Sequence, residues 1–169
     1  MSFALFFQYN ASPSILPLVA MATVAGTGTL LYFRYWRERS DALRKLASKR
    51  GLRWLPNTLP GDFPRKLLDD LYCGWVMPRW TRPHNMIGGE AGTDFLLAFD
   101  ITVAKGDTSY RRTIVARRSA TATPKSSLGK GYLYRCAGEW QLATPESSVF
   151  ASSRLIDPGT IEKLWEQLR

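Results

Sequence analysis

The sequence predicts an α+β protein, with one N-terminal transmembrane helix followed by a small antiparallel-sheet domain with flanking helices. Three observations lead to this prediction. No charged residue and no histidine occurs from Met1 to Phe33. The next segment, Arg34 to Arg53, holds eight positive and two negative side chains, a net charge of +6 out of the +9 of the whole chain. From Asn85 onward, apolar and polar residues alternate with the period of two that is typical of strands.

The first predicted element is a transmembrane helix over residues 15–33. At about 1.5 Å per residue, this uncharged stretch spans about 28 Å, which approaches the thickness of a bilayer core. Tyr32, Tyr35 and Trp36 lie at its end, where aromatic rings prefer the headgroup level. A buried core helix and a cleaved signal peptide are the alternatives. A signal peptide carries its positive charges before the apolar run, whereas here they follow it.

The charge distribution predicts an orientation, because Lys and Arg remain on the cytoplasmic side of a membrane. We expect residues 1–14 to form a non-cytoplasmic tail, 34–53 a basic juxtamembrane helix ending near Gly51, and 54–169 a cytoplasmic domain on the bacterial inner membrane. Anionic lipid or a partner is expected to contact the following residues near the end of the span: Arg34, Arg37, Arg39, Arg44, Lys45, Tyr32, Tyr35 and Trp36.

Small residues inside the predicted span indicate a helix-packing face. Ala22 and Gly26 are four residues apart, as are Ala25 and Thr29. Four residues advance a helix by about 400°, so each pair lies on one side. Such spacing lets another helix approach closely, which favours a packed helix over a lone lipid-facing anchor. The alternative is that alanine and glycine are simply common in membrane helices.

The remaining chain predicts strands between two helices, with the sheet covered on one face. The clearest element is a hairpin of residues 94–104 and 109–117, in which Phe95, Leu97 and Phe99 are expected to share a core with Trp165 or Leu168. The other predicted elements are a short helix over 63–71, strands over 131–136, 139–143 and 148–154, and a last helix capped at Asp157-Pro158.

Three short motifs in this domain carry a resemblance. Residues 85–89 read Asn-Met-Ile-Gly-Gly, 95–100 read Phe-Leu-Leu-Ala-Phe-Asp, and 113–116 read Thr-Ile-Val-Ala. Over residues 85–117, this pattern resembles small uncharacterised bacterial domains that are tethered by an N-terminal membrane helix. The resemblance implies a membrane-associated domain and no known reaction, and it carries over no catalytic residue.

The residues predict no enzyme, no metal site and no cofactor held by strong ligands of the chain itself. His84 is the only histidine, and Cys73 and Cys136 have no metal-ligand spacing and could pair or remain reduced. The segment that contains Arg79, Trp80 and Arg82 could stack on a nucleic-acid base, but a protein contact is favoured because Trp and Arg are common interface anchors. Nucleic acid is therefore a disfavoured partner.

Together these features predict a non-catalytic accessory subunit of a larger bacterial membrane complex, which stabilises neighbouring membrane-protein subunits through its helix and cytoplasmic domain. Energy-transducing assemblies, such as a photosynthetic reaction-centre–antenna or a respiratory complex, are the expected hosts, and such a host could supply pigments or lipids. The alternatives are a free-standing anchored adaptor that binds anionic lipid or a cytoplasmic partner, and a membrane-tethered enzyme with an unrecognised site.

Overall fold

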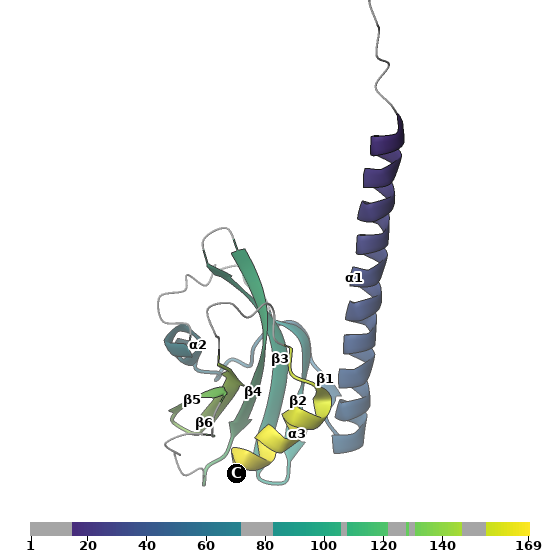
Figure 1. Cartoon of the computed structure of the whole chain (residues 1–169). Coiled ribbons are helices and arrows are strands. Elements are labelled where there is room, and N and C mark those ends of the chain that lie inside the picture. The colour runs from purple at the N-terminus through teal and green to yellow at the C-terminus, as the bar shows by residue number, and fades with distance from the viewer. Residues whose placement is uncertain (1–14, 72–82, 106–107, 122–127, 129–130, 147–154) are drawn as a thin grey trace, which may run out of the picture. The chain divides into compact units, whose positions relative to one another are not determined.

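A computed structural model describes residues 15–71, 83–105, 108–121, 128, 131–146 and 155–169. The chain divides into two compact units, Met1–Arg39 and Ser40–Arg169. Helix α1 (Ile15–Arg50) begins in the first unit and ends in the second. Figure 1 labels this helix and the elements that follow it. The helix ends where the sequence predicts, because Gly51 adopts a positive φ of 67° that other residues rarely adopt.

The described part of the first unit is the N-terminal part of α1. Its threonines turn their hydroxyl groups inward: Thr23, Thr27 and Thr29 each donate a hydrogen bond to the carbonyl oxygen four residues earlier. Further along, Arg34 forms an ion pair with Glu38 at 2.8 Å. All these interactions are local, as expected of a single helix, which has no interior in which to bury side chains.

The predicted transmembrane helix is contradicted. Among the residues that the structure describes, no helix is long and apolar enough to cross a membrane. In α1, threonines and glycines interrupt the aliphatic residues from Pro17 onward, and the charged residue Arg34 then follows. The fold is a long N-terminal helix and an antiparallel sheet with helices. The predicted inner-membrane, single-pass placement depended on the span and is contradicted with it.

The second unit is built on a six-stranded sheet with the order β1-β2-β3-β4-β6-β5, in which all neighbouring strands are antiparallel. The strands are β1 (Arg53–Trp54), β2 (His84–Ala91), β3 (Asp94–Lys105), β4 (Thr108–Arg118), β5 (Tyr132–Ala137) and β6 (Trp140–Pro145). The predicted hairpin is confirmed as β3 and β4, which pair from Phe95↔Arg118 to Lys105↔Thr108. The strand predicted over 148–154 lies outside the described residues.

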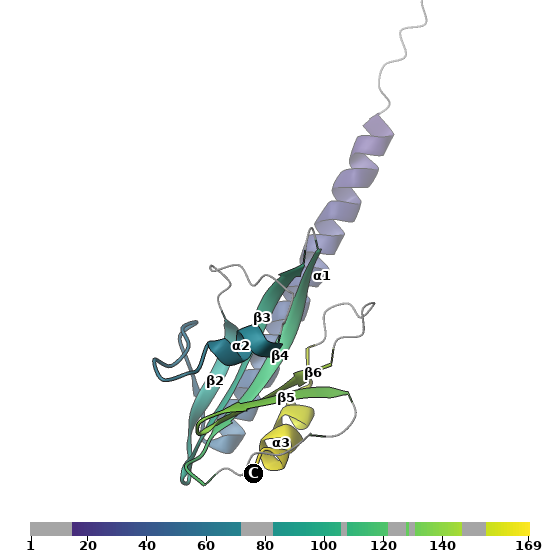
Figure 2. The same cartoon turned by 90° about the vertical axis from the view of Figure 1, so that its left-hand side faces the viewer.

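The sheet is covered on both faces, not on one as predicted. Helix α2 (Lys66–Leu71) and helix α3 (Pro158–Gln167) lie on opposite faces, as Figure 1 and Figure 2 show together. We call the two buried clusters the helix core and the aromatic core. The helix core includes Leu43, Leu46, Ala98, Val115, Ile161, Trp165 and Leu168, and the aromatic core includes Phe63, Leu67, Leu97, Phe99, Ile114, Trp140 and Leu142.

This arrangement corrects the predicted partners of the hairpin. Phe99 is fully buried, as expected, but its ring packs edge-on against Phe63, with the ring centroids 5.9 Å apart. Trp165 and Leu168 lie in the helix core, on the face of the sheet opposite Phe99, and β3 contributes Ala98 to that core. Because successive side chains of a strand point to opposite faces, one strand contributes to both cores. Trp165 also ties α3 to the strands, since its Nε1 donates to backbone oxygens of Leu97 and Ala116.

The predicted last helix is confirmed as α3, and its start has a clear cause. The side chain of Asp157 accepts a hydrogen bond from the backbone N–H of Thr160, and Pro158 occupies the first turn. The Thr160 hydroxyl also donates to this carboxylate, and the hydrogen bonds from the Thr160 hydroxyl and backbone N–H hold the pKa of the Asp157 carboxyl below its usual value. An aspartate at this position satisfies a backbone donor that the helix itself cannot pair.

One glycine in β2 is required by close packing. A Cβ atom at Gly88 would lie 2.8 Å from the backbone oxygen of Leu96 and 3.0 Å from Leu55 Cδ1. The first neighbour belongs to the paired strand β3 and cannot move without disturbing the sheet. Gly88 therefore permits β2 to approach both β3 and the segment after β1.

We predict that Gly88→Ala lowers the free energy of unfolding by about 1–3 kcal/mol, the usual cost of overpacking a core. Chemical denaturation followed by circular dichroism measures this change. Gly61→Ala is the matched control, because a Cβ at Gly61 meets no atom within 4 Å. Equal stability of Gly88→Ala and Gly61→Ala would contradict the close approach.

Candidate protein-interaction surfaces

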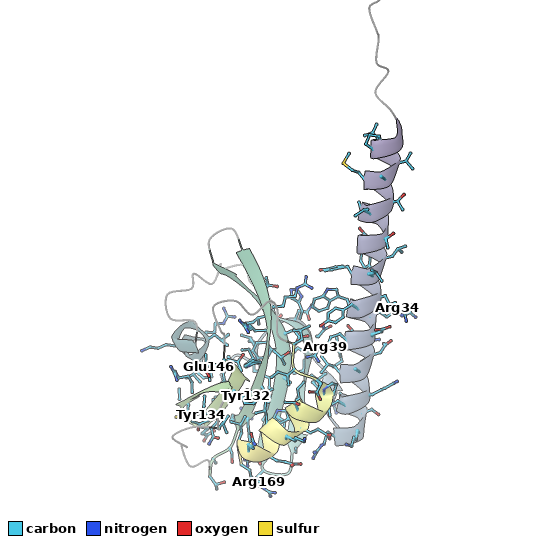
Figure 3. All side chains as sticks on the ribbon, viewed as in Figure 1. Arg34, Arg39, Tyr132, Tyr134, Glu146 and Arg169 are labelled. Carbon is cyan, nitrogen blue, oxygen red and sulfur yellow. The ribbon has the colours of Figure 1, made fainter. Side chains whose placement is uncertain are left out.

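The first candidate surface is the apolar surface of α1, which belongs to the first unit. Its large apolar side chains are 47–72% exposed, and Figure 3 shows them standing out from the helix. The members are Leu18, Val19, Met21, Val24, Leu30, Leu31, Tyr32, Phe33 and Tyr35. Tyr32 packs edge-on against Phe33, and Tyr35 packs edge-on against Trp36. At about 100° per residue, these side chains lie on all sides of the helix, and a large exposed apolar surface is typical of an interaction site.

The predicted packing residues lie together on one side of this helix. At about 100° per residue, Ala22, Ala25, Gly26 and Thr29 fall within a single sector of about 100°. No atom lies within 4 Å of a Cβ built at Gly26. The hydroxyl of Thr29 is bonded to the Ala25 carbonyl, so the side chains of this sector are small from Ala22 to Thr29, with Leu18 and Phe33 of the same sector at either end. That another helix packs there stays a prediction.

The second candidate surface belongs to the second unit and is named here the basic–tryptophan patch. It consists of Trp54 and Arg44, with the exposed Lys45 next to Arg44 on α1, whereas Arg53 precedes Trp54 on β1 and points to the opposite face of the sheet. The Arg44 guanidinium carbon lies 5.0 Å from the centroid of the Trp54 ring, within the range of a cation–π interaction. The Trp54 side chain lies on the edge strand β1, and the residue is 39% exposed. The patch therefore combines exposed positive charge with an exposed aromatic ring.

Neighbouring basic residues have a different role, because they fasten α1 to α3. Lys49 and Arg50 both bind the Glu162 carboxylate, at 2.9 and 2.6 Å, and Arg50 also reaches Glu166 at 3.1 Å. Hydrogen bonds from Lys49 and Arg50 hold the pKa of Glu162 below its usual value, and the same pairing raises the pKa of Arg50. These two cations are thus neutralised within the fold.

A buried polar network lies on the helix-core face of the sheet. Both oxygens of the Asp100 carboxylate accept hydrogen bonds, from Asn85 Nδ2 at 3.1 Å and from the Thr113 hydroxyl at 2.7 Å. Asn85 accepts in turn from the Ser40 hydroxyl, and the Thr113 hydroxyl accepts from the Ile156 N–H. The network therefore joins α1, β2, β3, β4 and the segment before α3.

Local backbone geometry places Asn85 in this network. Its φ of 50° is left-handed, a conformation that asparagine tolerates better than most residues, and the β2–β3 register shifts between His84 and Ile87. Asp100 pairs with Thr113 and lies on the face of β3 opposite Phe99, because successive side chains of a strand point to opposite faces.

The other residues singled out from the sequence do not gather into a site. His84 is exposed at the start of β2, and Cys136 is an exposed free thiol on β5. Cys73, Arg79, Trp80 and Arg82 lie outside the described residues, so the predicted protein contact at that segment is untested. Among the side chains that the structure does describe, no three of His, Cys, Asp or Glu are grouped to hold a metal ion.

Trp54 is the functional candidate that sequence reasoning missed. The sequence marks residues 52–55 only as a short extended piece. The available signal was the composition of residues 42–61, where five basic residues and a tryptophan occur without any acidic residue. The contact between Arg44 and Trp54 could not be read from spacing, because Gly51 reverses the chain between them.

Comparison with known proteins adds no relative. No protein-family model, no curated protein and no solved structure matches this chain.

We predict that Glu162→Gln lowers the free energy of unfolding by about 0.5–1 kcal/mol near neutral pH, the upper range for a partly solvent-screened ion pair. The depressed pKa of Glu162 stabilises the fold above the unfolded pKa of about 4.3, and this contribution is lost as pH falls through the lower folded value. The difference in the free energy of unfolding between the wild type and Glu162→Gln should therefore become smaller at acidic pH. Denaturation at several pH values measures it, with Glu139→Gln as the exposed control.

We predict that Thr113→Val lowers the free energy of unfolding by about 1–3 kcal/mol. Valine keeps the shape but removes the donor to Asp100 and the acceptor for the Ile156 N–H. Thermal and chemical denaturation measure the loss, and Thr58→Val, at an exposed position, serves as the control. A variant as stable as the wild type would show that the network contributes little.

Proposed function

We propose that this chain is a non-catalytic accessory subunit that stabilises a larger protein assembly. The first unit packs the apolar surface of α1 against a neighbouring subunit, and the second unit contacts further subunits through its own surface. The observation that carries the proposal is that the large apolar side chains between Leu18 and Tyr35 are exposed on all sides of α1.

The physical argument rests on the hydrophobic effect. Burying one large aliphatic or aromatic side chain contributes about 1.5–3 kcal/mol, so burying several of them favours association strongly. The described part of the first unit is a single helix and cannot bury these side chains within itself. A partner protein that covers them removes them from water, which supports a stoichiometric assembly rather than a transient encounter.

The small sector of α1 suggests how the partner approaches. Interaxial distances between packed helices fall to about 8 Å where the contact residues are small. Gly26 and Ala22 offer such a contact, whereas Val24, Leu31 and Tyr35 lie on the opposite side and supply bulk. A partner helix is therefore proposed to cross α1 at Gly26.

The test is native purification of the tagged full-length chain from the organism that encodes it, with quantitative mass spectrometry of what co-purifies. The wild type should recover at least one protein in a fixed ratio. Gly26→Leu should lower that ratio about tenfold, which corresponds to about 1.4 kcal/mol. The helix itself should persist, because no atom lies near the added side chain and leucine favours helix more than glycine does.

Thr27→Leu is the matched control, since it adds the same side chain about 100° further round the helix, away from Ala22 and Ala25. It should retain the partner. Recovery of the partner by Gly26→Leu at the wild-type ratio would contradict the proposed crossing point. The absence of any protein in a fixed ratio with the wild type would contradict the accessory role.

A further inference from the structure

The two edges of the sheet differ in how their backbone groups are used. Strand β1 forms one edge and strand β5 forms the other. At the β5 edge, the Arg135 side chain donates a hydrogen bond to the carbonyl oxygen of Tyr134. At the β1 edge, no described side chain bonds to the backbone of Trp54. The β1 edge is therefore the one that remains available to a further strand.

The register of β1 against β2 shows which backbone groups face this open edge. Trp54 lies directly opposite Ile87. The N–H of the next residue, Leu55, donates to the carbonyl oxygen of Met86 at 2.9 Å. In an antiparallel pair, opposed residues alternate between those that exchange hydrogen bonds and those that do not. Trp54 and Ile87 are opposed residues of the second kind, so the N–H and the carbonyl of Trp54 point away from β2.

The side chains next to this backbone lie on the two faces of the sheet. The Trp54 ring shares its face with Ile87 of the helix core, and the Arg44 guanidinium carbon lies 5.0 Å from the ring centroid. Arg53 points to the opposite face, is exposed, and forms no ion pair with any described residue. An added strand would thus meet an aromatic ring on one face and a positive charge on the other.

We propose that the β1 edge binds an extended segment of a partner protein as an added antiparallel strand. One residue of the segment pairs with the N–H and the carbonyl of Trp54, and its apolar side chain packs on the Trp54 ring. The adjacent residue points to the other face and places a carboxylate against Arg53. In strand addition, backbone hydrogen bonds supply affinity and alternate side chains supply specificity. The inference rests on the proposed accessory function, because it names the segment that the second unit contacts.

The length of β1 limits the size of this site. The strand has two residues, and Pro56 follows shortly after it and has no N–H. On the other side, the N–H of Leu52 already donates to the carbonyl oxygen of Ala47 at 2.8 Å. Trp54 is therefore the described residue of this edge that offers both a donor and an acceptor. A short segment anchored at the Trp54 ring fits such an edge better than a long strand does.

A second copy of this chain is the competing occupant. Pairing of two β1 edges would bring together two copies of residues 42–61, which contain five basic residues and no acidic residue. Like charges placed so close together repel one another. A partner segment that carries carboxylates instead matches the exposed charge of Arg53, so charge complementarity favours the acidic partner.

The experiment measures fluorescence anisotropy of the fluorescein-labelled peptide Glu-Val-Glu-Phe-Glu-Val-Glu, titrated with the purified full-length chain. We expect saturable binding. The rearranged peptide Glu-Glu-Val-Phe-Val-Glu-Glu has the same composition and charge without the alternation, and it should bind about tenfold less tightly. N-methylation of the phenylalanine removes the N–H that pairs with the Trp54 carbonyl, and it should also weaken binding about tenfold.

Two substitutions at Trp54 separate the ring from the backbone. Trp54→Ala removes the ring and retains the N–H, and it should weaken binding about tenfold. Trp54→Pro also removes the N–H, which β2 does not use, and it should weaken binding about tenfold further. Arg53→Ser should weaken binding up to about fivefold, the range of a cross-strand pair. Arg65→Ser, at an exposed position outside β1, is the matched control and should retain binding.

Circular dichroism should show every variant folded. Equal binding of the alternating, rearranged and N-methylated peptides would reduce the effect to charge and side chains and overturn the proposal, as would no binding at all. A wild-type dimer in analytical ultracentrifugation that Trp54→Pro dissociates would assign the edge to a second copy and also overturn it. Because the test uses the purified chain and a defined peptide, its failure would leave the co-purification result for Gly26 unaffected.

Discussion

The β3–β4 hairpin lies in the middle of the sheet, so it must bury both of its faces at once. Each strand therefore supplies apolar side chains to two separate cores, Phe99 and Ile114 to the aromatic core and Ala98 and Val115 to the helix core. Other elements of the second unit must therefore cover both faces of the hairpin. The last turns of α1 and helix α3 cover one face, while the segment from Phe63 to α2 covers the other.

The same requirement explains the buried polar network. Asp100 and Thr113 form a directly opposed pair on the helix-core face, where their polar atoms are removed from water. A buried carboxylate is tolerated only with hydrogen-bond donors around it. Asn85 supplies one through its left-handed backbone, and Thr113 supplies another while holding the Ile156 N–H. The polar contacts therefore fix where the covering helices join the sheet.

Local patterns in the sequence predicted local structure well. The period of two identified the hairpin, and Asp157-Pro158 identified the start of α3, because both signals act over a few residues. The second covered face escaped prediction, since Leu97 and Ala98 are both apolar and alternation alone does not reveal two cores. The predicted span over 15–33 is wrong; it rests on the absence of charge, whereas threonines and glycines also occur within the segment. Trp54 was missed because its contact with Arg44 depends on how the chain turns at Gly51.

Strand β5 lies at one edge of the sheet, where no described strand pairs with its outer side. The tight turn at Gly138 and the register with β6 leave the Tyr134 carbonyl directed away from β6, toward the open side. The Arg135 side chain bends back and donates to that oxygen at 2.8 Å. An incoming strand would have to break this bond and desolvate the guanidinium. Edge-to-edge polymerisation of the kind that seeds fibrils is thereby disfavoured at β5, even where many copies are crowded together.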